Sequence, residues 1–234
     1  MTHPPLHPWT LDPSEAIRLQ VELRQRLLLE WDGRPVELVG GVDVSFPGER
    51  ARAAIVVLRY ANLSPLASSI AEVPATFPYI PGLLAFREAP AILAAWERLP
   101  LKPDLLMFDG QGIAHPRGLG IASHVGLWLE KPTIGVAKSR LYGFHAEVGA
   151  RFGDWSQLTD EHDPDVVIGA VVRTREKTNP LYLSPGHRID LKHTISFVLA
   201  CCRGYRLPEP TRWAHKVGTG ESLPVEKGTQ YRLF

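Results

Sequence analysis

The first 30 residues carry a helical pattern. One stripe at spacings of three to four residues runs through Ile17, Val21, Arg24 and Leu28. Asp12 stands directly before Pro13, and a short acidic residue followed by proline is typical of the point where a helix begins. The periodicity therefore predicts a helix over residues 11–30.

Three strand patterns come next and predict a sheet built from hairpins. Apolar residues alternate with Asp43 and its polar neighbours over residues 37–46, which predicts a strand with one apolar face. A nearly unbroken apolar run over 51–60 predicts a more deeply buried strand, and a third strand is expected over 66–73. The connections are short, so we expect an antiparallel meander.

From residue 90 onward, helical and strand patterns alternate. The expected helices cover 90–99, 118–130 and 190–202, and the expected strands cover 104–108, 132–137, 166–172 and 181–183. Pro90 is best tolerated in the first turn of a helix, so the first of these helices is placed to begin there. Hairpins followed by alternating strands and helices predict an α/β fold, a mixed β-sheet flanked by helices on both faces. We find no internal repeat and no linker, so a single domain over residues 1–234 is the simplest organisation.

Composition excludes several classes of protein. The 234 residues are 44% hydrophobic and 22% charged, as in a soluble globular protein, which argues against a mostly disordered chain. No apolar run approaches the length of a membrane span, and the first residues lack the pattern of a signal peptide. Cys201 and Cys202 are adjacent, which suits neither a structural disulfide nor a zinc site. A reducing, cytoplasmic setting is therefore expected.

The charge is unevenly distributed along the chain. The net charge is +1, but residues 173–234 hold 11 Lys and Arg against 5 Asp and Glu. A basic C-terminal quarter on an acidic body is one way to meet nucleic acid. A solvated charged tail would give the same count, so this feature alone leaves both interpretations open.

Three carboxylates are the main candidates for chemistry. Asp43 lies in mid-strand on the face opposite the apolar residues. It is either a metal ligand, since a buried carboxylate needs a partner, or an exposed strand residue. Asp109 follows a buried strand, where ligands gather in α/β sheets. Glu88 precedes the expected helix at Pro90, where it also suits the helix dipole. Three carboxylates without a nearby Cys or His pair favour Mg²⁺ or Mn²⁺ over zinc, provided that they meet in space.

Basic groups lie in the same part of the chain. His115 follows Gly110-Gln111-Gly112, and Lys138 ends a predicted strand, so both are candidates for phosphate contact. A structural histidine and a solvated lysine are the alternatives. His215, in the basic tail, has a weak case from spacing alone.

The segment Phe77-Pro78-Tyr79-Ile80-Pro81-Gly82 is unusual because two prolines stiffen the backbone around an aromatic and an aliphatic side chain. A stiff loop that presents Tyr79 and Ile80 would act as a wedge between bases. A rigid turn whose side chains pack into the core is the alternative.

Taken together, these segments resemble the endonuclease V family, the deoxyinosine-specific nucleases. The matching segments are Gly41-Val42-Asp43-Val44-Ser45-Phe46, Pro78-Tyr79-Ile80-Pro81-Gly82, Phe86-Arg87-Glu88, Asp109-Gly110-Gln111-Gly112, His115-Pro116-Arg117, Gly120-Ile121-Ala122-Ser123-His124, Gly135-Val136-Ala137-Lys138, Ser184-Pro185-Gly186-His187 and Leu207-Pro208-Glu209-Pro210-Thr211-Arg212. They follow the family's order over residues 41–215. Each segment alone is weak, but the set is specific.

The resemblance implies a ribonuclease H-like fold and Mg²⁺-dependent hydrolysis of the second phosphodiester bond 3′ to a deoxyinosine, with Mn²⁺ as a substitute ion. Its implied metal ligands are Asp43, Asp109 and, as the third acidic member, Glu88. The partner would be damaged DNA that contains deoxyinosine, and the protein would act as a monomer in the cytoplasm without a membrane partner.

The resemblance also implies roles for the other candidates. The side chains expected to contact the scissile region are His115, Lys138 and His215. The wedge, which would contact DNA, consists of Pro78, Tyr79, Ile80 and Pro81. The pocket for the extruded base would be lined by Leu84, Gly110 and Ile121, mainly through backbone contacts.

Two rival functions stay open. One is a ribonuclease that acts on inosine-containing RNA, which differs in its tolerance of the ribose 2′-OH. The other is a catalytically silent nucleic-acid-binding module, for which three convergent acids would serve no purpose.

Overall fold

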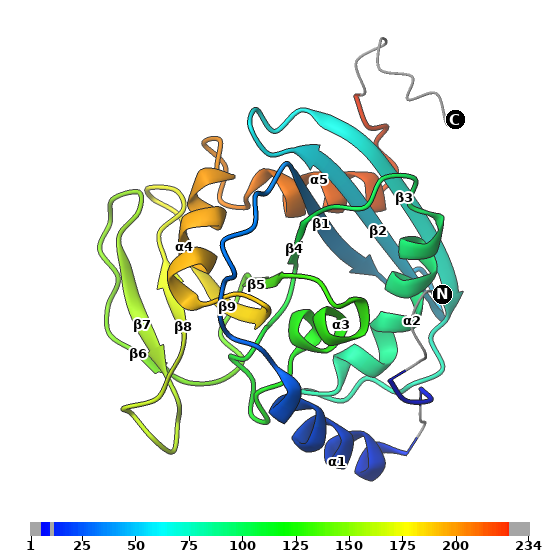
Figure 1. Ribbon diagram of the computed structural model, residues 1–234, viewed down its shortest axis with the longest axis horizontal. Coiled ribbons are helices and arrows are strands. Elements are labelled where there is room, and N and C mark those ends of the chain that lie inside the picture. Colours follow the sequence, from blue (N-terminus) through cyan, green and yellow to red (C-terminus); the bar gives the residue numbers. More distant parts are fainter. Residues whose placement is uncertain (1–5, 10–11, 225–234) are drawn as a thin grey trace.

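The computed structural model describes residues 6–9 and 12–224, and within them nine strands form one sheet in the order β3-β2-β1-β4-β5-β9-β8-β7-β6 (Figure 1). The strands are β1 (Leu38–Ser45), β2 (Arg50–Arg59), β3 (Pro65–Pro74), β4 (Leu105–Phe108), β5 (Thr133–Ala137), β6 (Phe144–His145), β7 (Trp155–Thr159), β8 (Val167–Val172) and β9 (Leu181–His187). The helices are α1 (Pro13–Leu23), α2 (Leu84–Arg98), α3 (Ile121–Leu129), α4 (Leu191–Ala200) and α5 (Glu209–Gly218), with a 3₁₀ turn at Arg24–Arg26.

Strand directions divide the sheet. β1, β2 and β3 form the predicted antiparallel meander, while β1, β4 and β5 run parallel to one another. The strands from β5 through β9, β8 and β7 to β6 are again antiparallel. The prediction of a mixed sheet with hairpins before the α/β part is confirmed.

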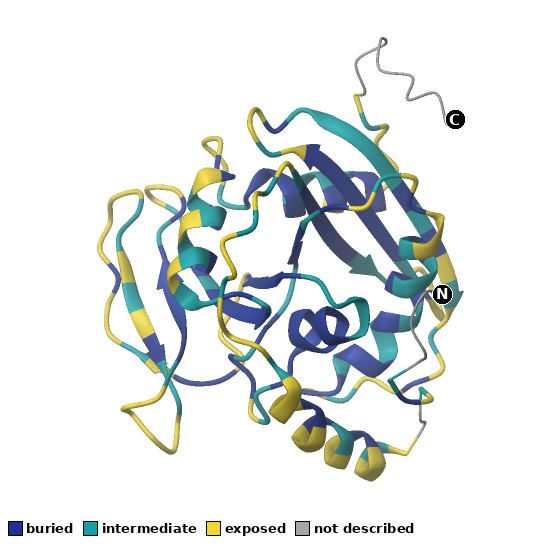
Figure 2. Cartoon of the chain, viewed as in Figure 1, coloured by how far each residue is buried: buried dark blue, intermediate teal, exposed yellow. Residues whose placement is uncertain are grey.

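Helices cover both faces of the sheet, as predicted. On one face, α2 and α3 pack against an apolar cluster that includes Val42, Ile55 and Phe108. On the other face, α4 and α5 pack against a cluster that includes Val56 and Met107. The central strands are accordingly buried (Figure 2). Among the described residues, no helix is long and apolar enough to cross a membrane.

The first helix is shorter than its pattern predicts, and it buries another face. Asp12 caps α1 by accepting hydrogen bonds from the backbone of the next turn, as expected. The helix ends at Leu23, and Leu11, where the prediction started, lies outside the described residues. The stripe through Ile17, Val21 and Leu28, whose spacing predicted the helix, is exposed. The buried positions are Ala16, Gln20 and Leu23, a set whose small and polar members carry little hydrophobic signal.

Helix α2 corrects a second boundary. It begins at Leu84, so Pro90 is an interior residue rather than part of the first turn. Proline removes one helical hydrogen bond, but the buried Ala85, Phe86 and Ala89 on its N-terminal side hold this turn in the core. Glu88 therefore lies within the helix instead of preceding it.

Three elements were missing from the sequence prediction. The short strands β6 and β7 extend the sheet, and β9 continues to His187 instead of ending at residue 183. Helix α5 occupies the segment that was expected to be a basic tail. Its buried residues include Pro210, Thr211, Ala214 and Gly218, so it lacks a stripe of large apolar side chains.

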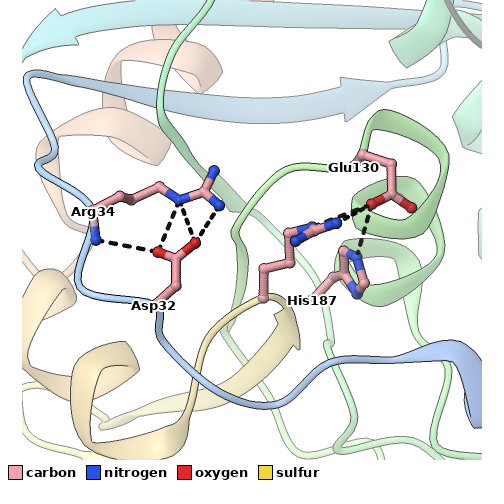
Figure 3. A network of polar contacts seen from close by, with 5 residues as sticks. Asp32, Arg34, Glu130 and His187 are labelled. Atoms are coloured by element: carbon pink, nitrogen blue, oxygen red, sulfur yellow. Dashed lines mark hydrogen bonds and ion pairs between the residues drawn. The ribbon is translucent and has the colours of Figure 1, made fainter.

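Leu28 joins the chain between α1 and β1 to the carboxyl end of β9 at one edge of the sheet, and Figure 3 shows the polar contacts nearby, with Asp32 beside Arg34 and Glu130 beside His187. Glu130, at the end of α3, forms an ion pair with Arg188 and lies 3.8 Å from His187 Nε2. His187 Nδ1 accepts a 3.3 Å hydrogen bond from the backbone N–H of Leu28, and burial lowers the pKa of this imidazole to about 4. This edge lies at the carboxyl end of β9, opposite the edge where β1, β4 and β5 end.

Candidate active site

The parallel pairing of β1 and β4 brings two acids together. Val42 is aligned with Phe108, and the Asp109 backbone N–H donates to Val42 O at 3.0 Å. Asp43 and Asp109 are therefore neighbours on adjacent strands, on the face that α5 covers. Asp43 is buried, although an ionised carboxylate is costly to bury without a partner.

The electrostatics of the carboxylates show that they repel one another. Burial, together with the neighbouring Asp109, raises the pKa of Asp43 to about 6. Burial also raises the pKa of Glu88 to about 8, with further contributions from Asp109 and Asp43. The site therefore favours either proton uptake or a cation that neutralises this negative charge.

Two basic side chains reach the same acids. Lys138, which follows β5, forms an ion pair with Asp109. His215 Nδ1, on α5, donates to Asp43 Oδ2 at 3.3 Å. The close approach of α5 to β1 depends on Gly41, where a Cβ would lie 1.8 Å from Pro210 O. The structure thus joins five of the six predicted catalytic residues: Asp43, Glu88, Asp109, Lys138 and His215.

The acids suit a hard divalent cation in ligand type and charge. All three offer carboxylate oxygens, which Mg²⁺ and Mn²⁺ prefer. The raised pKa values of Asp43 and Glu88 show that negative charge accumulates at this point. As placed, however, no three His, Cys, Asp or Glu side chains within residues 6–9 and 12–224 form a complete metal-ligand group. The donors fit such an ion in their chemistry.

The proline-rich segment forms a rigid turn that exposes an aromatic ring. Ile80 O accepts a 2.9 Å hydrogen bond from Leu83 N, and Gly82 has a φ of +80°. With proline at the second position and this glycine at the third, the turn is of type II. Tyr79 is 69% exposed, whereas Phe77 is buried and Ile80 packs partly against the core. Of the predicted wedge, Pro78, Tyr79 and Pro81 are exposed and Ile80 is partly exposed.

His115 does not join the carboxylate cluster. Its ring is buried; Nε2 donates to Gly82 O at 2.8 Å and Nδ1 accepts from Arg117 N at 3.1 Å. Burial lowers the pKa of this imidazole to about 4, so it is neutral near pH 7. These contacts hold the turn at residues 80–83, which we call the wedge turn.

Two further residues complete this support, and the sequence did not single them out. Gly82 O also accepts hydrogen bonds from Gln20 Nε2 at 2.9 Å and from Arg117 Nη2 at 2.8 Å. Arg117 Nε in turn donates to Gln20 Oε1 at 2.5 Å. We call Gln20, His115 and Arg117 the Gly82 clamp. Gln20 carries no local signal in the sequence, because its burial is seen only in the structure.

The predicted base pocket is partly assembled. A Cβ on Gly110 would lie 2.6 Å from Ile121 Cγ2, so these two positions are in contact. Ile121 is buried in the cluster beneath α2, while Leu84 is partly exposed at the start of that helix. Their role in holding a base stays a prediction.

Comparison with known proteins decides the family. Residues 19–216 match the family model described as Endonuclease V. An endonuclease V of Trichormus variabilis is 49% identical over 216 residues, which cover 91% of this chain and 96% of the relative. The chain belongs to the endonuclease V family. Membership confirms the resemblance seen in the sequence, and endonuclease V proteins are nucleases that depend on a metal ion.

Solved endonuclease V structures share the fold. The protein from Streptomyces avermitilis superposes with a TM-score of 0.84 at 41% identity, covering 91% of this chain and 93% of that one. Endonuclease V of Ciona intestinalis, in complex with a 23mer DNA containing an inosine followed by a ribo-adenosine, gives 0.78 at 28% identity, covering 88% and 95%. The ribonuclease H-like fold is thus confirmed.

Proposed function

We propose that this member of the endonuclease V family recognises deoxyinosine in DNA and hydrolyses the second phosphodiester bond on its 3′ side with Mg²⁺. The observation that carries the proposal is the cluster of Asp43, Glu88 and Asp109 beside Lys138. The segment with the exposed Tyr79 follows β3, which ends at the same sheet edge as β1 and β4. The complex of the Ciona relative with inosine-containing DNA supports the choice of lesion.

The acids would hold the ion and the basic groups would handle the phosphate. Asp43 and Asp109, with Glu88 as the third acid, are the residues proposed to hold Mg²⁺ or Mn²⁺. When bound, such an ion supplies charge stabilisation at the phosphate and a more acidic water. Lys138 then offers positive charge to the phosphate or the leaving oxygen, and His215 orients the Asp43 carboxylate.

Recognition would combine the wedge with a pocket. Tyr79 fills the gap that is left when the lesion leaves the stack, and a poorly paired base costs less to extrude than a well-paired one. The pocket lined by Leu84, Gly110 and Ile121 would distinguish hypoxanthine from adenine by offering a hydrogen-bond donor where adenine carries its amino group. We propose further that residues 1–234 act as one domain, as a monomer in the cytoplasm.

The test is a nicking assay on three substrates of one sequence: inosine DNA duplex, undamaged duplex and inosine RNA, each with Mg²⁺ and with EDTA. A Mg²⁺-dependent cut one nucleotide beyond deoxyinosine supports the proposal. Asp43→Ala and Asp109→Ala should abolish the cut but keep binding to inosine DNA. Unchanged nicking by either variant would overturn the metal assignment, and binding without cleavage by the wild type would indicate a silent binder.

A ribonuclease is the second candidate, favoured by one observation. The DNA in the Ciona complex carries a ribo-adenosine directly after the inosine, so that relative accommodates a 2′-OH there. Strong cleavage of the RNA substrate would move the assignment to this alternative.

The proposed role of the wedge in recognising the lesion is tested by substitutions of Tyr79. Tyr79→Ala should weaken discrimination between inosine and undamaged duplexes, while Tyr79→Phe keeps the ring and serves as the matched control. Wild-type discrimination by the alanine variant would count against the wedge.

A further inference from the structure

A hollow lies directly beside Lys138, on the side away from the wedge. It has a volume of about 430 Å³ and is walled by the loop after β5, the segment between β6 and β7, and the loop between β8 and β9. A second hollow of about 630 Å³ continues it and shares Arg173 and Asn179 with it. We call the two together the basic hollow.

Strand directions place the basic hollow at the catalytic edge of the sheet. β9 is antiparallel to β5, so its first residues lie next to the end of β5, where Ala137 is paired with Tyr182. β8 is antiparallel to β9, so it ends at the same edge, where Val172 is paired with Leu181. The loop 173–180 therefore faces the same side as Asp109 and Lys138.

The hollow carries an excess of positive charge. Its lining includes five Lys and Arg residues but two Glu residues, Glu147 and Glu176. Arg140, Arg151 and Lys177 are exposed, and none of them forms an ion pair within the described residues. These three cations are available for an anionic ligand.

Two buttressing arginines hold the walls in place. Arg173 Nε donates to Gly149 O at 3.0 Å, and its Nη1 donates to Thr178 O, so one guanidinium joins the segment between β6 and β7 to the loop between β8 and β9. Arg206 Nη2 donates to Lys138 O at 2.6 Å and to Pro180 O at 3.0 Å. Both guanidinium groups bind neutral carbonyls, so their charge is not cancelled and adds to the field of the hollow.

We propose that the basic hollow binds the phosphodiester backbone of the cleaved strand on the 3′ side of the cut. This rests on the proposed function, because the wedge, the carboxylates and the hollow then follow the strand in its 5′ to 3′ order. The turn that bears Tyr79 belongs to the β3 and α2 side of the acids, whereas the hollow belongs to the β5 and β9 side. When the lesion in the DNA lies at the wedge and the scissile phosphate lies at the acids, the 3′ part of the cleaved DNA strand continues into the basic hollow.

The test varies the charge of the hollow and the length of the substrate together. The variant combines Arg140→Gln with Lys177→Gln. Lys192 is an exposed lysine at the start of α4, and Lys192→Gln is the control for the loss of a surface charge. Inosine duplexes end either two or twelve nucleotides beyond the cut. Binding is measured in EDTA against salt, and cleavage is measured in single turnover with Mg²⁺.

We expect the double variant to bind the long duplex about tenfold more weakly, with a salt dependence shallower by about two phosphate contacts. On the short duplex it should match the wild type, and the cleavage rate of bound substrate should not change. An equal loss on both duplexes, or no loss on the long one, would overturn the proposal. Wild-type protein that fails to cut either duplex would instead refute the proposed function.

Discussion

Gly82 joins the wedge turn to the clamp that supports it, so its replacement by alanine tests how the wedge is held. The residue has a φ of +80°, a conformation that a residue with a Cβ adopts at a cost of about 1–2 kcal/mol. A Cβ here would also lie 2.7 Å from Arg117 Nη2 and 3.3 Å from His115 Nε2. The substitution therefore strains the turn and crowds the clamp.

Crowding of the clamp determines how much free energy of unfolding Gly82→Ala loses beyond the backbone strain. Moving Arg117 away breaks its bond to Gly82 O, and a hydrogen bond that involves a charged group contributes about 1.5–3 kcal/mol. Gly33 provides the matched control, because its φ is +78° and nothing lies within 4 Å of a Cβ there. We expect Gly82→Ala to lower the free energy of unfolding by about 1.5–3 kcal/mol more than Gly33→Ala.

Urea unfolding of the two variants, together with the ratio of inosine to undamaged nicking, is the assay. Gly82→Ala should lower this ratio and Gly33→Ala should keep it. In a double-mutant cycle, Arg117→Ala makes room for the new Cβ, so the added cost of Gly82→Ala should shrink toward that of the control. Equal losses at Gly82 and Gly33, with normal discrimination in both, would refute the clamp.

Three other perturbations address the acids and their neighbours. In EDTA, the thermal midpoint should fall as pH rises from about 4.5 to 8, because folding raises the pKa of Glu88 and the stability present at low pH is lost when this carboxyl ionises. Glu88→Gln should flatten this fall, since the variant has no carboxyl to ionise. Lys138→Met should slow single-turnover cleavage about 10²-fold while changing the free energy of unfolding by less than about 1 kcal/mol, since its ion pair with Asp109 is partly exposed; unchanged cleavage would exclude a role at the phosphate. His115→Phe should cost about 1–3 kcal/mol in urea unfolding, because the Arg117 N–H loses its acceptor, and an unaltered midpoint would contradict the assigned contacts.

The sequence predicted the elements whose own pattern reports their burial. The meander, β4, β5 and α3 carry alternating or continuous apolar residues, and all were found. Helix α5 was missed because small and polar residues form its buried face, and it lies on β1 through the close approach at Gly41. The start of α2 was misplaced because Pro90 is held inside a helix by tertiary packing that no local rule includes.

The same distinction applies to the site. The apolar pattern predicted that Asp109 and Lys138 follow buried strands, and the parallel pairing of β4 and β5 in the structure brings the two side chains to one sheet edge. The contact between His215 and Asp43 needs α5, and the position of His115 depends on a carbonyl 33 residues away. Gln20 is still less accessible to sequence reasoning, because its partners, two backbone carbonyls and the Arg117 side chain, lie in loops distant in sequence.

Under the proposed function, the distance between lesion and cut is set by how rigidly the Tyr79 turn and the acids are held relative to each other. Asp43 and Asp109 are fixed by a parallel strand pair, whereas Tyr79 is fixed through the bonds that Gly82 O receives from α1 and from the loop after β4. Removing the Tyr79 ring leaves this spacing intact, so the position of the cut should stay the same while recognition weakens. Loosening the clamp changes the spacing itself, so Gly82→Ala should also produce cuts at neighbouring phosphates. Removal of the Tyr79 ring thus tests what the wedge contacts, whereas Gly82→Ala tests how the clamp positions the wedge relative to the acids.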